Sequence, residues 1–175
     1  MKFRQIFIVS IVILLYGFSV QVPAMSAEKG VRPCLTSDLI GTWELRNISS
    51  RIKIGPDDSF GWPYQRFAFD IRGDVKEMVS TTPIESNKAA VQKFEKTAST
   101  SKFMVNERGV LTITKIESPQ PEQCMCAYAI KDVPAEKLVK IPESKRALIP
   151  HLGDVVLTYL NRSGQPLVIK SLRKV

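Results

Sequence analysis

The chain has 175 residues, of which 44% are hydrophobic, and a net charge of +8. This length and composition fit one globular domain with a single core. The positive charge favours anionic partners, such as an anionic component of a cell envelope. Because the chain contains no arginine-rich run interleaved with aromatic residues, nucleic acid is not an expected partner.

The N-terminus has the features of a secretory signal. Basic residues precede an almost unbroken apolar run from Ile6 to Val20, and Pro23–Ala27 supplies the small residues at which a signal peptidase cuts. We expect residues 1–27 to be a signal peptide and residues 28–175 to be one exported domain, periplasmic or secreted, with no transmembrane segment after cleavage. The alternative is an uncleaved anchor, although the run is slightly shorter than the ~18 to 20 residues that span a bilayer.

All three cysteines, Cys34, Cys124 and Cys126, lie in the expected exported part. In an oxidising compartment they predict one disulfide and one free thiol, and a bridge from Cys34 to either of the others would tie the N-terminal segment to a late strand. Cys-Met-Cys is also a spacing that suits Cu(I) or Zn(II). Since no histidine or further cysteine lies nearby in the sequence, we expect a structural disulfide, no metal site and no cofactor.

The first half of the domain predicts three strands. A capped helical turn at Thr36–Ile40 is followed by a strand from Thr42 to Ile52, which Gly55 and the residues after it end. Apolar and charged residues then alternate from Tyr64 to Arg72, which is typical of a half-buried antiparallel strand. Val75 to Thr81 is its expected partner after a turn.

One helical passage interrupts the strands. Thr82 can cap it, Pro83 suits the first helical position, and a glycine-free run continues to about Thr97. Apolar residues fall on one face and lysines on the other, so we expect an amphipathic helix packed against the mouth or the side of a barrel. It would be either a packing element or a gate for a ligand.

The second half predicts five further strands, which are Lys102–Asn106, Val110–Ile116, Gln123–Lys131, Asp154–Asn161 and Leu167–Lys174. The intervening segment Pro134–Gly153 contains two internal prolines and is expected to be an extended loop with a short strand at Lys137–Ile141. The total of about eight strands predicts an all-β fold, an antiparallel up-and-down barrel with one inserted amphipathic helix and a short N-terminal helical turn.

The segment Leu39-Ile40-Gly41-Thr42-Trp43-Glu44-Leu45 carries a resemblance. Gly41 and Trp43 resemble the glycine, any residue, tryptophan signature that opens the first strand of lipocalins and lipocalin-like (calycin-type) bacterial exported barrels. The resemblance implies that Trp43 closes the barrel floor and that a basic residue near the last strand packs over it, for which Arg173 is the matching candidate.

A barrel of this kind predicts a binding role. We expect an exported protein that binds a small hydrophobic or amphiphilic ligand, and seven residues are the candidates to line or fill the interior: Phe67, Phe69, Phe103, Leu111, Ile113, Met125 and Tyr159. The alternative is a non-catalytic envelope or secreted interaction or inhibitor module with a filled barrel, using the loop Phe60–Pro63 or the basic loop Pro134–Gly153.

Catalysis is not expected from this sequence. The only histidine, His151, lies in a proline-bounded loop, and no serine, histidine and acid set has a recognisable spacing. Haem binding through one histidine is the alternative, and a Soret band would reveal it.

Overall fold

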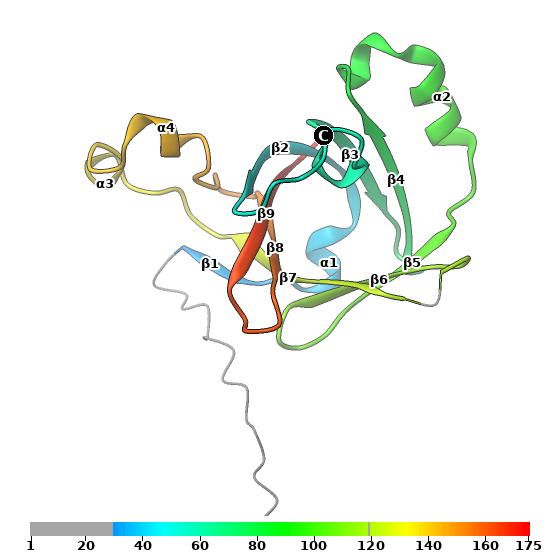
Figure 1. Ribbon diagram of the computed structural model, residues 1–175. Helices are drawn as coiled ribbons and strands as arrows, with labels where there is room; N and C mark the ends of the chain where they lie inside the picture. Colours follow the sequence, from blue (N-terminus) through cyan, green and yellow to red (C-terminus); the bar gives the residue numbers. More distant parts are fainter. Residues whose placement is uncertain (1–29, 119) are drawn as a thin grey trace, which may run out of the picture.

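The computed structural model describes residues 30–118 and 120–175 (Figure 1). The expected signal peptide, residues 1–27, lies outside this range. Within the described range, no helix has both the length and the hydropathy needed to cross a membrane.

Eight consecutive antiparallel strands close into a barrel, which Figure 1 shows approximately along its axis. Each strand pairs with the next in sequence, and the last pairs with the first. The strands are β2 (Gly41–Ser50), β3 (Tyr64–Phe69), β4 (Asp74–Ser80), β5 (Ser101–Val105), β6 (Val110–Lys115), β7 (Glu122–Ala129), β8 (Val155–Leu160) and β9 (Pro166–Lys174). The predicted all-β, up-and-down barrel is confirmed.

A short additional strand, β1 (Val31–Pro33), pairs with the end of β7. Directly after it, Cys34 forms a disulfide with Cys126, whose sequence separation of 92 residues makes it a long-range cross-link. Cys124 is free and buried. The expected pairing of Cys34 with one of the two late cysteines is therefore confirmed, and Cys126 is the partner.

One end of the barrel is closed by α1 (Thr36–Leu39), a single helical turn. The Asp38 carboxylate accepts a hydrogen bond from the Leu35 backbone N–H at 2.7 Å and forms an ion pair with Arg32 at 2.6 Å. Leu39 is fully buried, and its carbonyl accepts the indole N–H of Trp43 at 2.6 Å. The turn is thereby fixed across the floor of the barrel.

The inserted helix is shorter than predicted. A 3₁₀ turn, η3 (Ile84–Ser86), precedes α2 (Lys88–Lys96), which packs on the outer side of β4. Asn87, rather than Thr82, caps the helix, because its side chain accepts the Ala90 N–H at 3.0 Å. The helix thus lies on the side of the barrel.

The segment between β7 and β8 differs from its prediction. Residues 131–153, here called the lobe, contain two short helices, α3 (Ala135–Leu138) and α4 (Glu143–Arg146), and no strand at Lys137–Ile141. Each helix begins directly after a proline, Pro134 or Pro142, which needs no backbone N–H at a helix start. Of the two internal prolines that predict an extended loop, Pro142 instead starts a helical turn, so that prediction was wrong; the lobe projects from the barrel in Figure 1.

Candidate functional site

The half of the barrel interior next to α1, here called the floor, is apolar and filled. Trp43 is 1% exposed and lies at the centre of this half. The buried residues that pack with it are Leu39, Phe69, Leu111, Cys126, Val155 and Leu172. Such an interior has the character of a protein core rather than of a binding cavity.

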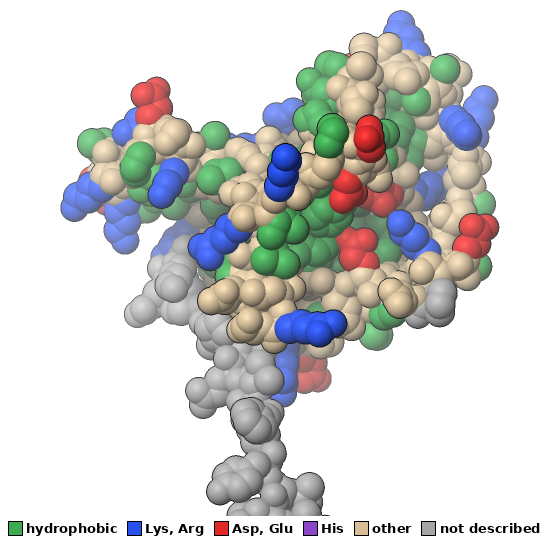
Figure 2. All heavy atoms as spheres, in the orientation of Figure 1, with side chains coloured by type: hydrophobic (Ala, Val, Ile, Leu, Met, Phe, Trp, Pro, Cys, Tyr) green, Lys and Arg blue, Asp and Glu red, His purple; other side chains and the backbone are tan. Residues whose placement is uncertain are grey.

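The opposite half, here called the mouth, is polar. It contains Gln65, Glu77, Lys115, Glu122, Tyr159 and Lys170. Alternation along the strands brings these side chains inside, since Gln65 is in phase with Phe67 and Phe69, and Lys170 is in phase with Val168 and Leu172. Figure 2 shows acidic side chains among hydrophobic ones in the hollow centre of this face.

Lys170 is the most unusual residue of the mouth because it is a lysine with only 1% exposure. Its ammonium donates to the side-chain oxygen of Gln65 at 2.9 Å and lies 3.7 Å from the centroid of the Phe60 ring. The Gln65 amide in turn donates to the carbonyls of Phe60 and Trp62, each at 2.9 Å. Burial lowers the pKa of Lys170, against the opposing effect of Glu77 and Glu122.

The loop between β2 and β3 supplies the cover over Lys170. Phe60 lies in a 3₁₀ turn, η2 (Ser59–Gly61), and its ring meets that of Tyr159 edge-to-face at 4.8 Å. Trp62 is half-buried, and its indole N–H donates to the Pro56 carbonyl at 3.0 Å. This loop is therefore folded onto the barrel and does not present an exposed tryptophan anchor.

Glu77 faces a small hollow at the mouth. Its exposed side chain shares this hollow with Phe67, Val75, Ser101, Ile113, Lys115 and Glu122. The hollow has a volume of about 20 Å³, which is room for about one water molecule. Partial loss of hydration against the barrel wall raises the pKa of Glu77 above its usual value, while Lys170 opposes this and Glu122 adds to it. Because water reaches the carboxyl, the charged form is partly screened.

Cys124 lies where the apolar floor meets the polar mouth, beside the mouth residue Tyr159. Burial raises the pKa of the Cys124 thiol to about 12 and raises that of the Tyr159 hydroxyl, which lies beside Cys124 and Glu122. A thiol with so high a pKa is a poor nucleophile, because the thiolate is the reactive form. Cys124 therefore has a packing role in the folded protein.

The glycine-tryptophan signature has a different basic partner from the one predicted. Trp43 pairs across the ladder with Lys174, and the Lys174 ammonium lies 5.7 Å from the indole ring. Gly41 has φ +125°, and a Cβ there would lie 2.8 Å from the Lys174 side chain, so glycine leaves room for that lysine. Arg173 is exposed, and its cross-strand neighbour in the ladder is Glu44. The prediction for Arg173 was wrong by one position, which in a strand reverses the face.

Six of the seven candidate lining residues belong to the interior. Phe67, Phe69, Phe103 and Leu111 are core residues, and Ile113 and Tyr159 pack against them. Met125 is the exception: it follows Cys124, which is inward in register with Leu111, and so lies on the outer face of β7. Its assignment to the interior was wrong.

The charged residues of the mouth were not among the sequence candidates. The alternation could have revealed Glu77 and Lys170, and with them the polar Gln65, because each is in phase with apolar neighbours on its own strand. A polar residue in an apolar phase is the pattern that would have revealed them.

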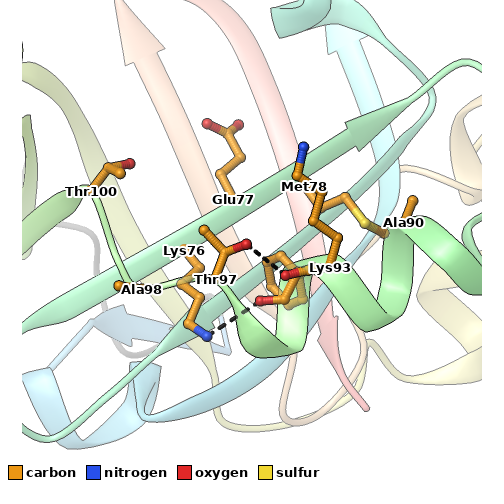
Figure 3. A pocket seen from close by; sticks show the side chains of 9 residues that line it. Lys76, Glu77, Met78, Ala90, Lys93, Thr97, Ala98 and Thr100 are labelled. Carbon is orange, nitrogen blue, oxygen red and sulfur yellow. Dashed lines mark hydrogen bonds between the residues drawn. The ribbon is translucent and has the colours of Figure 1, made fainter.

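A second hollow, of about 250 Å³, lies outside the barrel between α2 and β4 (Figure 3). Lys76 and Met78 face it from the strand, and Lys76 donates to the carbonyls of Phe94 and Glu95 near the end of α2. Figure 3 shows Glu77 pointing to the other side of the strand. The helix is thus attached to β4 by a lysine that satisfies its C-terminal carbonyls.

The only histidine lies in the lobe. The His151 ring nitrogen Nδ1 is 3.4 Å from the Asp132 carboxylate, and both side chains are largely exposed. His151 lies between the end of β7 and the start of β8, whereas the mouth residues of these two strands, Glu122 and Tyr159, lie at their opposite ends.

Comparison of the chain with models of protein families, with curated proteins and with solved structures finds no match. The closed eight-stranded antiparallel barrel is compatible with a lipocalin-like fold. Functional inference for this chain accordingly depends on its own geometry.

Proposed function

We propose that the protein is a lipocalin-like, exported binding protein, periplasmic or secreted, that takes a small amphiphilic ligand at the mouth of its barrel. The observation that carries this proposal is the division of the interior into a filled apolar floor and a polar mouth where Glu77 faces a water-accessible hollow. The Cys34–Cys126 disulfide supports an oxidising compartment.

The division of the interior favours an amphiphilic ligand over a wholly hydrophobic one. The floor leaves no room for an apolar chain to enter deeply, whereas Phe67, Val75 and Ile113 offer an apolar wall beside Glu77 at the mouth. The polar part of the ligand would meet the charged side chains, and its apolar part would displace water from that wall. Since the hollow holds about one water molecule, binding requires the side chains that line the mouth to move apart.

The test is titration with a fluorescent fatty-acid analogue whose emission depends on polarity, together with mass spectrometry for co-purified lipid. We expect a saturable blue shift. The variant Ile113→Trp, which fills the mouth, should weaken binding at least about tenfold, as expected when apolar contact area is replaced by steric conflict. Met104→Trp is the matched control, because Met104 is exposed on the outer face of the neighbouring strand β5. Absence of a saturable signal in the unsubstituted protein would refute the proposal.

A second candidate is a non-catalytic interaction or inhibitor module. The filled floor favours it, because a barrel packed with its own side chains needs no ligand. The two candidates differ in the fluorescence titration, since an interaction module with a filled barrel gives no saturable signal and no effect of Ile113→Trp.

A further inference from the structure

The lobe combines exposed apolar side chains with free cationic ones. Val139 is 75% exposed and Leu152 is 60% exposed, which is unusual for large aliphatic residues. Lys137, Lys140 and Lys145 are exposed and form no ion pair within residues 30–118 and 120–175. Figure 2 shows basic side chains gathered along the outer and lower side of the lobe, with green apolar atoms between them.

The base of the lobe is fixed to the barrel. Arg46 of β2 donates to the Ile149 carbonyl at 3.1 Å and to the Asp154 carboxylate at 2.7 Å. Asn47 donates to the Ala147 carbonyl at 2.9 Å, and the Asp132 carboxylate accepts the Leu152 N–H at 2.9 Å. These bonds hold residues 147–154, the segment that directly follows α4, at a defined place beside β2.

The lobe also contains a hollow of about 440 Å³ with a mostly apolar lining. Val133, Leu138, Ile149 and Pro150 form its apolar part, and its polar part consists of Arg146 and of Asp132, which lies beside His151. The Arg146 guanidinium donates to the Ile141 carbonyl at 3.0 Å, which keeps the charge beside this lining. Apolar side chains next to a guanidinium are complementary to a lipid that carries an anionic headgroup.

We propose that the lobe docks on an anionic phospholipid surface. Val139 enters the boundary between headgroups and acyl chains, while Lys137, Lys140 and Lys145 bind the anionic headgroups. Charge complementarity selects this partner. Residues 131–153 carry five basic residues against the acidic Asp132, Glu136 and Glu143, a surplus of two positive charges beside exposed aliphatic side chains. The inference is independent of the ligand proposed for the mouth.

The experiment places a polarity-sensitive fluorophore at Val139→Cys in the full chain. Labelling is selective because Cys124 is buried with a pKa of about 12 and the other cysteines form the disulfide. Ala89→Cys, on the exposed side of α2, is the matched label control. The labelled proteins are mixed with vesicles of phosphatidylcholine alone or of phosphatidylcholine and phosphatidylglycerol in equal parts. A label at position 139 reports insertion of the lobe itself, whatever other part of the chain meets the vesicle.

We expect a blue shift at position 139, but not at position 89, on the vesicles with phosphatidylglycerol, and its loss in high salt. In the labelled Val139→Cys protein, replacement of Lys137, Lys140 and Lys145 by glutamine should lower the apparent affinity at least about tenfold, as expected for basic residues at an anionic surface. Replacement of Lys88, Lys93 and Lys96 of α2 removes the same charge and should change it less than about twofold if contact is local. An unshifted emission at position 139, an equal shift on both kinds of vesicle, or an equal effect of the two triple variants would overturn the proposal.

Discussion

The floor and the mouth of the barrel are made by the same strands, yet their interiors have opposite chemistry. At the floor, Trp43 and its apolar neighbours exclude water, and α1 and the disulfide fix the end of the barrel. At the mouth, Lys170 is buried against Gln65 and Phe60, while Glu77 remains in contact with water. The larger apolar burial lies at the floor, and the mouth carries polar groups that a core alone does not need.

Trp43→Ala should give the largest loss of stability. It removes a buried indole and its hydrogen bond to Leu39, so the free energy of unfolding should fall by about 3 to 5 kcal/mol. Denaturant unfolding followed by circular dichroism measures this. Trp62→Ala, in the loop at the mouth, should cost about 1 kcal/mol or less. Equal losses in the two variants would contradict the division between the two ends.

Removal of the disulfide should have the next largest effect. Cys34→Ala with Cys126→Ala opens a closure between residues 92 positions apart, which should lower the free energy of unfolding by about 3 kcal/mol. Reduction of the unsubstituted protein should shift its denaturation midpoint similarly. Cys124→Ala is the control, since it removes a buried thiol but no cross-link, and reductant should still destabilise it. Insensitivity of the unsubstituted protein to reductant would argue against a stabilising cross-link at the floor.

Lys170→Met should have a smaller effect that depends on pH. At neutral pH we expect a loss of about 1 kcal/mol, because Gln65 loses its buried donor. The folded-state pKa of Lys170 lies below its unfolded value, so between the two values the unfolded state binds more protons and stability rises with pH. The substitution removes this gain. The free energy of unfolding of the unsubstituted protein should therefore exceed that of Lys170→Met by a growing amount as pH rises towards about 10, near the ordinary lysine pKa.

Unfolding curves at neutral and alkaline pH measure the effect, and Gln65→Leu provides a double-mutant cycle. Gln65→Leu alone leaves the ammonium without its acceptor, whereas the double variant should recover part of that loss. Additive effects of the two substitutions would show that the pair does not interact.

Glu77→Gln should give the smallest change in stability. The pKa of Glu77 is raised in the folded protein, so above the unfolded value the ionised carboxyl costs stability, and the cost increases as pH rises to the folded pKa. Relative to the unsubstituted protein, Glu77→Gln should therefore gain stability as pH rises above about 4, near the ordinary glutamate pKa, and the two proteins should be equally stable at lower pH. Glu95→Gln, exposed on α2, is the control. A gain that appears only on acidification would contradict a raised pKa.

Local sequence patterns were sufficient for the strands because alternation and turn residues act over a few positions. Asp74–Ser80 and Val110–Lys115 agree within one residue at each end with the predicted Val75–Thr81 and Val110–Ile116 for this reason, whereas Tyr64–Phe69 ends three residues before the predicted Arg72. The lobe was predicted less well, since a proline ends one kind of local structure and equally starts another, and only its surroundings decide between them. The basic partner of Trp43 was misplaced by one residue because the register between β2 and β9 is a property of the closed barrel.

The sequence by itself determined the fold class, the approximate places of the eight strands, and the limit of one disulfide among three cysteines, because these follow from periodicity and composition. The tertiary structure decided which cysteine pairs with Cys34, which basic residue lies over Trp43, and that Lys170 and Glu77 share one end of the interior. Each of these depends on how strands far apart in the chain are aligned around the barrel, and that alignment is fixed only when the last strand closes on the first.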